Sequence, residues 1–590
     1  MPLLSVDDLT IGFGPAGLAP PVVQGVSFDV EPGQVLALVG ESGSGKTLTG
    51  KSLMRLLPRA AHIARGSAWF EHAGDRTDLL ALPDKVMRSY RGSKVSMIFQ
   101  EPMSALSPLH RVGDQVAEVL RVHGQAGGGA EEDKVLSIFE EVGFPSPERA
   151  WSAYPFELSG GLRQRAVIAM AMVANPALVI ADEPTTALDV TTQAMVLDTL
   201  NKMRRDHGTA VILITHDLGV VANMADRVVV MRRGRVMEAG AAREVLAQPG
   251  HGYTKALIAA APSIPDDIAV QADPDLDVIV RVKALSKTYP GRRRTFGGAD
   301  TPVRALADFN LHLERGKTVA IVGESGSGKS TVAKLILRAE RPDPGAEMTF
   351  CGRDGVNQDI AALSGSALTA FRRNAQMVFQ DPYAALSPRM SVQDILLEPL
   401  KIHEVGDKDS RRERTRYLMG RVGLSADHLA RFPHAFSGGQ RQRIAIARSL
   451  ALEPELLVCD EPTSALDVSV QKEVLALLAE LRAEMGLSYL FISHDLAVVA
   501  TLADRVLVMR RGRVVEEGSA DCVFRDPRHP YTRALIAASP EPDMDRRLDL
   551  KAVAAGAGEP ETWPEPFRYM GQNAPGLVEV TPGHLVRQAA

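Results

Sequence analysis

The sequence contains few cysteines, few aromatic residues and no long uninterrupted apolar run. Only Cys351, Cys459 and Cys522 are cysteines among 590 residues, and no two form a CxxC pair. This usage suggests neither a disulfide framework nor a zinc ribbon, and it favours a reducing cytoplasm. Apolar runs such as residues 166–174 stop well short of the roughly 18 residues that a membrane-spanning helix needs. We therefore expect any membrane role to come through a partner.

The sequence also lacks a strong excess of either charge. Lys and Arg number 67 against 72 Asp and Glu, for a net charge of -5, which argues against broad nonspecific binding to nucleic acid. The first eight residues have no basic segment and include two aspartates, so no secretory signal is expected. The length indicates roughly four folding units at about 150 residues each.

Two long stretches of the chain repeat each other. GESGSGKT at residues 40–47 recurs as GESGSGKS at residues 323–330, and several shorter motifs follow each in the same order. The repeat predicts two copies of one domain, residues 1–262 and 278–540. The acidic, proline-containing residues 263–277 between them read as a linker.

The proline-rich residues 541–590 have no counterpart in the first copy. We expect them to be a loosely ordered extension. The alternative is that Trp563, Phe567 and Tyr569 dock this extension on the second copy.

Each GxxxxGK[ST] motif follows an apolar run, residues 35–39 or 318–322, and precedes a helical stretch. That context predicts a phosphate-binding loop, because glycines let backbone N–H groups turn inward around phosphate. Lys46 and Lys329 would reach the outer phosphates, and Thr47 and Ser330 would ligate magnesium. The candidate loop residues are Gly40, Ser42, Gly43, Gly45, Lys46, Thr47, Gly323, Ser325, Gly326, Gly328, Lys329, Ser330 and Thr331.

Residues 177–181 and 456–459 predict buried parallel strands, each ending in an Asp-Glu pair at the sheet edge where ligands gather. Asp182 and Asp460 are suited to the magnesium shell. Glu183 and Glu461 are placed to orient and deprotonate a water for attack on the γ-phosphate.

A further strand in each copy, residues 211–215 or 489–493, delivers a histidine. A lone histidine after an apolar strand is more often structural than catalytic. Because His216 and His494 recur at corresponding positions, we interpret both as γ-phosphate contacts with a catalytic role.

Together with Gln100 and Gln380, the LSGG and FSGGQ segments, DEPT, ALD and the final histidines, these motifs resemble the nucleotide-binding domains of ATP-binding cassette (ABC) ATPases. The resemblance implies an α/β fold of two tandem P-loop NTPase (RecA-like) domains. Each would carry an antiparallel β subdomain and a helical subdomain, at about residues 101–160 and 381–437. ATP and Mg²⁺ are the implied cofactors, with Gln100 and Gln380 as implied metal ligands.

Each SGG segment would place a serine at the N-terminus of a helix and so form an anion site. In the family this site closes over ATP held by the opposite domain, which implies that Lys46 faces Ser437 and Lys329 faces Ser159. Leu162 departs from the family's Gln, so the Lys329 site is expected to be weaker or slower, although both should turn over. The implied contacts are Ser159, Gly160, Gly161, Ser437, Gly438, Gly439 and Gln440.

Tyr289 stands where the family stacks an aromatic side chain on adenine. Phe13 aligns with it in the first copy, but packing in the core is an equally good explanation for that residue.

The segments after Gln100 and Gln380, and residues 251–257 and 529–535, resemble the two ATPase subunits of oligopeptide and dipeptide importers fused in one chain. The resemblance implies an ATPase that drives two integral-membrane permease subunits from the cytoplasmic face of the bacterial inner membrane. An exported binding protein would supply the substrate. No cysteine cluster follows Cys522, so no iron–sulfur centre is expected.

Two other hypotheses remain open. A soluble ABC ATPase acting on ribosomes or nucleic acid is disfavoured by the short acidic linker and the importer-type segments. A nucleotide-sensing module without turnover is disfavoured because Glu183 and Glu461 are both present.

Overall fold

A computed structural model describes residues 1–14, 20–125, 130–186, 188–265, 277–290, 302–464, 466–571 and 573–589. The chain forms two compact units, Met1–Ala261 with Asp467–Ser469 and Ala538–Leu550, and Pro262–Leu466 with Val470–Ala537 and Lys551–Ala590. Most of the expected linker, and Ala187 and Ala465 of the two ALD motifs, lie outside the described residues. Within the described ranges, no helix is both long and apolar enough to span a bilayer.

A six-stranded sheet forms the centre of the first unit, in the order β10-β9-β3-β8-β7-β6. Five strands run parallel, and β10 pairs antiparallel with β9. The residues of β3, β7 and β8 are buried throughout. Both faces of these strands are covered, which explains why their sequences are nearly continuous apolar runs. The strands are β3 (Val35–Val39), β6 (Val95–Ile98), β7 (Leu178–Asp182), β8 (Ala210–Thr215), β9 (Arg227–Arg232) and β10 (Arg235–Ala241).

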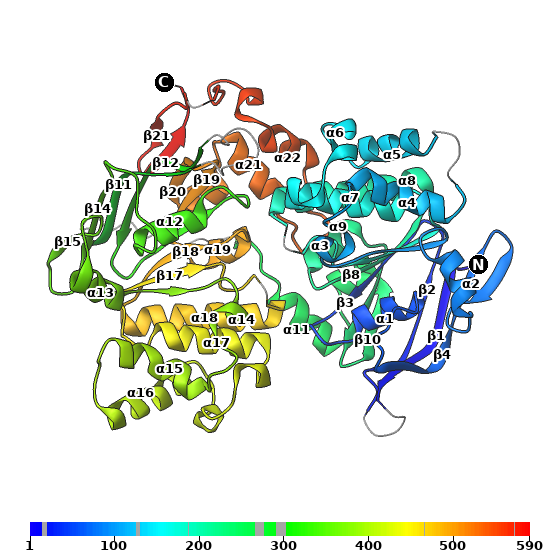
Figure 1. Ribbon diagram of the computed structural model, residues 1–590, viewed down its shortest axis with the longest axis horizontal. Coiled ribbons are helices and arrows are strands. Elements are labelled where there is room, and N and C mark those ends of the chain that lie inside the picture. The colour runs from blue at the N-terminus through cyan, green and yellow to red at the C-terminus, as the bar shows by residue number, and fades with distance from the viewer. Residues whose placement is uncertain are drawn as a thin grey trace. The chain divides into compact units, whose positions relative to one another are not determined.

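A second, antiparallel sheet in this unit has the order β2-β1-β4-β5, and a group of helices containing α4 to α7 lies together in Figure 1. The strands are β1 (Leu4–Phe13), β2 (Val23–Val30), β4 (Ala61–His72) and β5 (Asp75–Asp78). The helices are α1 (Lys46–Leu53), α2 (Asp84–Tyr90), α3 (Pro102–Ala105), α4 (Val112–Val122), α5 (Ala130–Glu141), α6 (Pro147–Ser152), η1 (Pro155–Glu157), α7 (Gly160–Met172), α8 (Val190–His207), α9 (Leu218–Met224), α10 (Ala242–Ala247) and α11 (Gly252–Ala260).

The second unit repeats this plan, with a larger main sheet ordered β16-β17-β18-β13-β19-β20-β22-β21 and a four-stranded sheet ordered β12-β11-β14-β15. The predicted α/β fold is therefore confirmed in both units. The strands are β11 (Val278–Tyr289), β12 (Val303–Glu314), β13 (Thr318–Val322), β14 (Glu347–Cys351), β15 (Asn357–Asp359), β16 (Ala375–Val378), β17 (Leu456–Asp460), β18 (Ser488–Ile492), β19 (Arg505–Arg510), β20 (Arg513–Ser519), β21 (Leu577–Thr581) and β22 (His584–Arg587).

The helices of the second unit follow the same order as those of the first, and α15 and α16 lie at the end of the unit away from β21 (Figure 1). They are α12 (Lys329–Ile336), α13 (Gly365–Asn374), α14 (Pro382–Ala385), α15 (Val392–Ile402), α16 (Lys408–Arg421), η2 (Ala426–His428), η3 (Pro433–Ala435), α17 (Gly438–Ser449), α18 (Val468–Met485), α19 (Leu496–Leu502), α20 (Ala520–Arg525), α21 (Pro530–Ala537), α22 (Leu550–Ala557) and η4 (Pro560–Thr562).

The C-terminal extension is folded, so the expectation of a loosely ordered segment is wrong. Strand β22 pairs with β20 and extends the main sheet of the second unit. Trp563 is only 2% exposed, and it joins the apolar core of that unit with Tyr569, while Phe567 packs against the same core half-buried. Proline content misled the expectation, because three aromatic side chains supply enough buried area to offset the entropy of ordering the segment.

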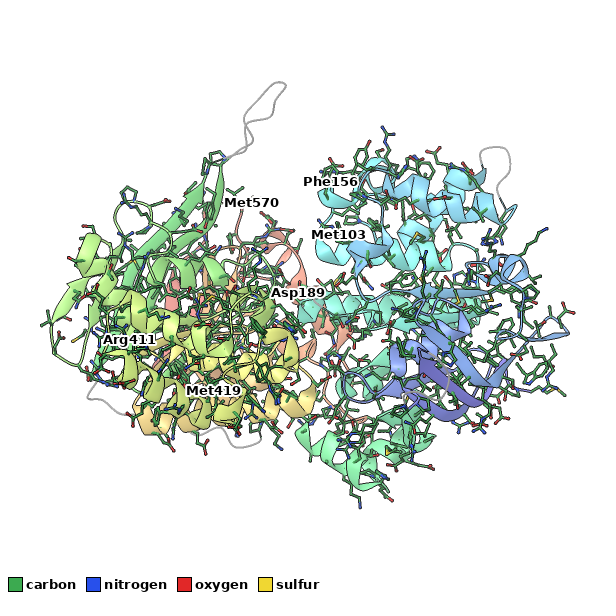
Figure 2. The ribbon with its side chains drawn as sticks, turned by 60° about the horizontal axis from the view of Figure 1, so that its bottom comes forward. Met103, Phe156, Asp189, Arg411, Met419 and Met570 are labelled. Atoms are coloured by element: carbon green, nitrogen blue, oxygen red, sulfur yellow. The ribbon has the colours of Figure 1, made fainter. Side chains whose placement is uncertain are left out.

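Replacing Trp563 by Ala should destabilise the second unit by about 3–5 kcal/mol, because it removes a fully buried aromatic side chain and leaves a cavity. Denaturant unfolding of the full chain measures this change. Met570, which is 67% exposed and labelled in Figure 2, is the matched control. Met570→Ala should stay within about 0.5 kcal/mol of the parent, and equal effects of the two changes would contradict the packing described here.

Candidate nucleotide sites

The two phosphate-loop motifs fold into the same tight turn between a central strand and a helix. Gly40 has φ 146° and Gly323 has φ 148°, conformations that side chains with a Cβ rarely adopt. A Cβ on either glycine would lie 2.1 Å from the carbonyl oxygen of Met231 or Met509. The loop therefore requires glycine at its first position in both copies.

The remaining candidate loop residues lie where the motif places them. Gly43, Gly45, Gly326 and Gly328 all have positive φ. Exposed Ser42 and Ser325 lie in the turn, and Thr47, Ser330 and Thr331 lie in the first turn of α1 or α12.

The lysine of each loop folds back inside it. Lys46 Nζ donates hydrogen bonds to Gly40 O at 2.6 Å and Glu41 O at 3.0 Å. Lys329 Nζ bonds Gly323 O and Glu324 O at 2.7 and 2.8 Å. Burial lowers the pKa of Lys46, because a desolvated ammonium is disfavoured. A phosphate group would offset that cost, so the loop fits a polyanionic ligand.

A hydroxyl and a carboxylate meet beside each loop. Thr47 Oγ1 donates to Asp182 Oδ1 at 2.9 Å, and Ser330 Oγ donates to Asp460 Oδ1 at 3.2 Å. Burial raises the pKa of both aspartates despite these hydrogen bonds. A cation would relieve this desolvation, and hydroxyl, carboxylate and amide oxygens are the donors that hard cations prefer.

Glu183 and Glu461 each stand at the centre of a three-residue cluster. Gln100 Nε2 donates to Glu183 Oε2 at 2.8 Å, and His216 Nδ1 lies 3.1 Å from Glu183 Oε1. In the second unit Gln380 Nε2 donates to Glu461 Oε2 at 2.8 Å. His494 Nδ1 lies 3.2 Å from the same oxygen.

The electrostatics of these clusters keep the two glutamates ionised. Burial alone would raise the pKa of Glu183 and Glu461, but the hydrogen bond to the histidine and its charge outweigh burial and lower it. Burial would likewise lower the pKa of His216 and His494, but the glutamates raise it. Each histidine therefore favours the ionised carboxylate, the form of the glutamate that can accept a proton, and each glutamate favours the protonated imidazole.

The backbone at the two glutamates is strained. Glu183 has φ 48° and Glu461 has φ 47°, a left-handed conformation that costs a residue with a side chain of order 1–3 kcal/mol. In both cases the backbone N–H bonds the carbonyl of the neighbouring strand, Ile214 O or Ile492 O, at 2.9 Å. The sheet thus holds the carboxylate in a fixed direction.

Both SGG segments start a helix as predicted. The hydroxyls of Ser159 and Ser437 accept the backbone N–H of residues 162 and 440. In the second copy Gln440 Oε1 also accepts the Ser437 N–H at 3.1 Å, which completes a capping box. Leu162 has no side-chain acceptor for this second bond. The departure from the family pattern therefore weakens the start of α7 specifically.

The two glycines of each SGG segment have different surroundings. A Cβ on Gly161 would lie 2.4 Å from Thr192 Cγ2, and one on Gly439 would lie 2.1 Å from Val470 Cγ1. The second glycine therefore lets α7 approach α8, and α17 approach α18. Gly160 and Gly438 have no such close neighbour, and they are the first residues of α7 and α17, where N–H groups lack partners within the helix.

The two candidate adenine contacts lie at strand ends. Tyr289, the last residue of β11, donates its hydroxyl to Glu340 Oε2 at 2.5 Å. Phe13, the last residue of β1, is 37% exposed. Partial exposure fits a stacking surface better than a core position for Phe13.

Sequence reasoning missed five residues near these sites. Thr186 Oγ1 donates to Glu183 Oε2 at 2.9 Å. Asp217 caps α9 and Asp495 caps α19, which fixes the turn just after each histidine. Tyr253 and Tyr531 accept the N–H of the second loop residue through their hydroxyls. Only the Asp after each histidine carried a local signal, as an N-cap before an apolar run.

Completing the capping box in the first copy should stabilise the start of α7. In Leu162→Gln the amide hydrogen of Ser159 should exchange about three- to tenfold more slowly, because the new side chain accepts it. The reciprocal Gln440→Leu change should speed exchange at Ser437 by a similar factor. Residue-resolved hydrogen exchange measures both, and unchanged rates would show that the second hydrogen bond contributes nothing.

Comparison with known proteins agrees with this geometry. The family model "ABC transporter" matches residues 23–186 and 306–464. The model "Oligopeptide/dipeptide transporter, C-terminal region" matches residues 237–277 and 515–565, once after each ATPase core.

The chain is also similar to curated proteins over nearly its full length. It is 44% identical to the peptidoglycan transport ATP-binding protein YejF of Agrobacterium fabrum, over 91% of this chain and 96% of that protein. It is 40% identical to the glutathione import ATP-binding protein GsiA of Salmonella choleraesuis, over 99% of this chain and 96% of the relative. The Escherichia coli K12 GsiA matches at 40% over 99% and 97%. The chain therefore belongs to the ABC transporter ATPases, and within them to the oligopeptide/dipeptide group whose ATP-binding domains are fused in tandem.

Proposed function

We propose that this protein is the ATP-hydrolysing, energy-coupling subunit of a bacterial importer for dipeptides, oligopeptides or related compounds. The proposal rests on the site that both units assemble: a loop lysine, a hydroxyl bonded to an aspartate, and a Gln–Glu–His cluster. A match to the oligopeptide-transporter C-terminal region follows each site. The peptidoglycan and glutathione named for the relatives support a peptide-like cargo.

Within each site the roles follow from the donor atoms. The phosphate loops hold the ATP phosphates, with Lys46 and Lys329 on the outer groups. Thr47 and Gln100, or Ser330 and Gln380, would hold Mg²⁺, and Asp182 or Asp460 would support the ion beside them. When bound, the cation neutralises the charge that develops on the transferred phosphoryl group.

Glu183 and Glu461 accept the proton of the attacking water, because their carboxylates are ionised and fixed by the strained backbone. His216 and His494 lie beside them and contact the γ-phosphate. Tyr289, and Phe13 in the first copy, stack on adenine.

We further propose that the two ATPase domains pair within one chain, with Lys46 facing Ser437 and Lys329 facing Ser159. The site that contains Ser159 is then the slower one. Support comes from the incomplete capping box at Leu162, which loosens the helix start that would contact the nucleotide.

The permease would dock beside the two glutamines. A groove of about 1120 Å³ in the second unit runs from Ser330 and Gln380 to Ile402 and Glu398, and Ile402 is 67% exposed. The first unit exposes Met103, Leu109 and Phe156 in the corresponding segments, and Figure 2 places Met103 and Phe156 on its helical part. These exposed apolar side chains are the proposed contacts with the permease.

Two integral-membrane permease subunits are the proposed partners, at the cytoplasmic face of the inner membrane, and an exported binding protein delivers the substrate. An action on ribosomes or nucleic acid is the weaker candidate, because both C-terminal regions match a transporter family.

The Glu183→Gln, Glu461→Gln double variant should hydrolyse ATP about 10²–10⁴-fold more slowly in a single turnover, because both general bases are lost. Rapid-quench measurement with the purified chain and its permease tests this expectation. The variant should still bind ATP, which separates loss of chemistry from loss of folding. Single-turnover hydrolysis at the parent rate would remove the proposed role of the glutamates.

Charge placed on the docking surface should release the permease. Ile402→Asp and Leu109→Asp should each lower the amount of this chain retained on permease-containing membranes by about tenfold, since a buried carboxylate has no partner there. Met570→Asp, at a position as exposed as Ile402, should leave retention unchanged. If all three variants were retained as well as the parent, the permease contact would lie elsewhere.

A further inference from the structure

The C-terminal extension encloses one arginine of the second unit. Arg510 is 5% exposed. Its guanidinium donates to Gly556 O at 3.3 Å and Ala557 O at 2.7 Å, at the end of α22. The indole of Trp563 lies 5.3 Å from the guanidinium carbon and donates its own N–H to Gly556 O at 3.0 Å. The extension therefore fixes this side chain with two carbonyls and one aromatic face.

Arg510 in turn contacts a tyrosine that touches the phosphate loop. Its guanidinium lies 4.5 Å from the ring centre of Tyr531, which is fully buried. The Tyr531 hydroxyl accepts the backbone N–H of Glu324 at 2.9 Å. Arg510 Nη1 also lies 3.8 Å from Glu324 Oε1. Glu324 O accepts a hydrogen bond from Lys329 Nζ at 2.8 Å, so a single residue, Glu324, links the tyrosine to the loop lysine.

The backbone beside Arg510 contacts the loop as well. A Cβ on Gly323 would collide with Met509 O, and Gly512 N donates to Ser327 O at 2.9 Å. The backbone shortly before and after Arg510 thus packs directly against the phosphate loop. A shift of this strand end would move the loop directly.

Packing around Tyr531 is equally tight on the extension side. A Cβ on Gly556 would lie 2.1 Å from Pro530 O, so α22 presses against the start of α21. His529 stacks edge-on against Trp563 at 4.7 Å, and its Nδ1 accepts the Tyr531 N–H at 3.1 Å. Burial lowers the pKa of His529 to about 3, which keeps the ring neutral and able to accept this bond.

The first unit contains the same pair without the enclosure. Arg232 lies 4.5 Å from the ring centre of Tyr253, but Arg232 is exposed. The Tyr253 hydroxyl accepts the Glu41 N–H at 3.4 Å, a longer and weaker bond than its counterpart. The chain therefore supplies its own matched comparison.

We propose that the C-terminal extension holds the second phosphate loop in its nucleotide-binding shape, through Arg510 and Tyr531 as positioning residues. The first loop has no such support from Arg232 and is contacted instead by Asp467, which accepts the Ser42 N–H at 2.7 Å, and by Ser469, which donates to Glu41 Oε1 at 2.8 Å. Preorganisation of a site lowers the cost of binding, so the extension makes the second loop the tighter nucleotide site. This inference rests on the proposed binding of ATP at Lys329 and is independent of the transported substrate.

The test measures each loop separately in the full chain. Lys46→Ala removes the first site and leaves the second, whereas Lys329→Ala does the opposite. ADP with Mg²⁺ is the probe, because it engages the phosphate loop without hydrolysis. Titration calorimetry gives its Kd in each background.

In the Lys46→Ala background, Arg510→Met should raise the Kd for ADP about three- to tenfold, because two charge-assisted hydrogen bonds to the extension are lost. Arg232→Met in the Lys329→Ala background should change it less than twofold. Tyr531→Phe removes a single hydroxyl from an otherwise intact ring and should raise the Kd about two- to fivefold. Tyr253→Phe should again have the smaller effect.

The inference predicts a larger effect on Kd in the second loop than in the first for each matched pair. A general loss of stability would not distinguish the two loops. An unchanged Kd in Tyr531→Phe, or equal effects of Arg510→Met and Arg232→Met, would overturn it while leaving the proposed function intact. Failure of the Lys46→Ala parent to bind ADP at all would overturn the proposed function together with the inference.

Discussion

The hydrogen bond between a loop hydroxyl and a strand-end aspartate is the contact on which both sites depend. Thr47 to Asp182, and Ser330 to Asp460, tie the phosphate loop to a strand that lies two places away in the parallel sheet. The aspartates can take this place only because their strands are buried on both faces and end together at one edge. The residue after each strand is the glutamate, so one register sets the positions of the loop hydroxyl, the aspartate and the glutamate together.

That register also explains why strain is tolerated at Glu183 and Glu461. A left-handed backbone conformation normally favours glycine. Here the neighbouring strand accepts the N–H of the glutamate, and the histidine and glutamine hold its carboxylate. Strain of order 1–3 kcal/mol is small beside the burial of the surrounding core. The side chain is therefore directed by the sheet and does not depend on a flexible loop.

Much of this arrangement could be predicted from local sequence. The glycine motifs, the buried runs and the Asp-Glu pairs each carry a short-range pattern, and the strands at residues 35–39 and 318–322 have the predicted bounds. The folding of the extension could not be predicted in this way. Its stability comes from Trp563 packing on His529, about thirty residues away, and from β22 pairing with β20. Contacts such as Tyr531 to Glu324 join residues about two hundred positions apart, where no periodicity or motif can signal them.

The two copies are similar in chemistry but differ in their support. The second has a full capping box at Ser437 and a phosphate loop backed by the extension, whereas the first has Leu162 and an exposed Arg232. The helix start and the loop of the second copy are both better fixed. In the proposed pairing these two features belong to different composite sites, so neither site would combine both advantages.

The central claim is that one chain contains two competent nucleotide sites. Its most direct test is the amount of ATP retained per chain when hydrolysis is blocked, measured by rapid filtration of the Glu183→Gln, Glu461→Gln variant with radiolabelled ATP and Mg²⁺. The account predicts two ATP molecules for each chain. Retention of one at saturation would show that one copy has lost its site, and would contradict it.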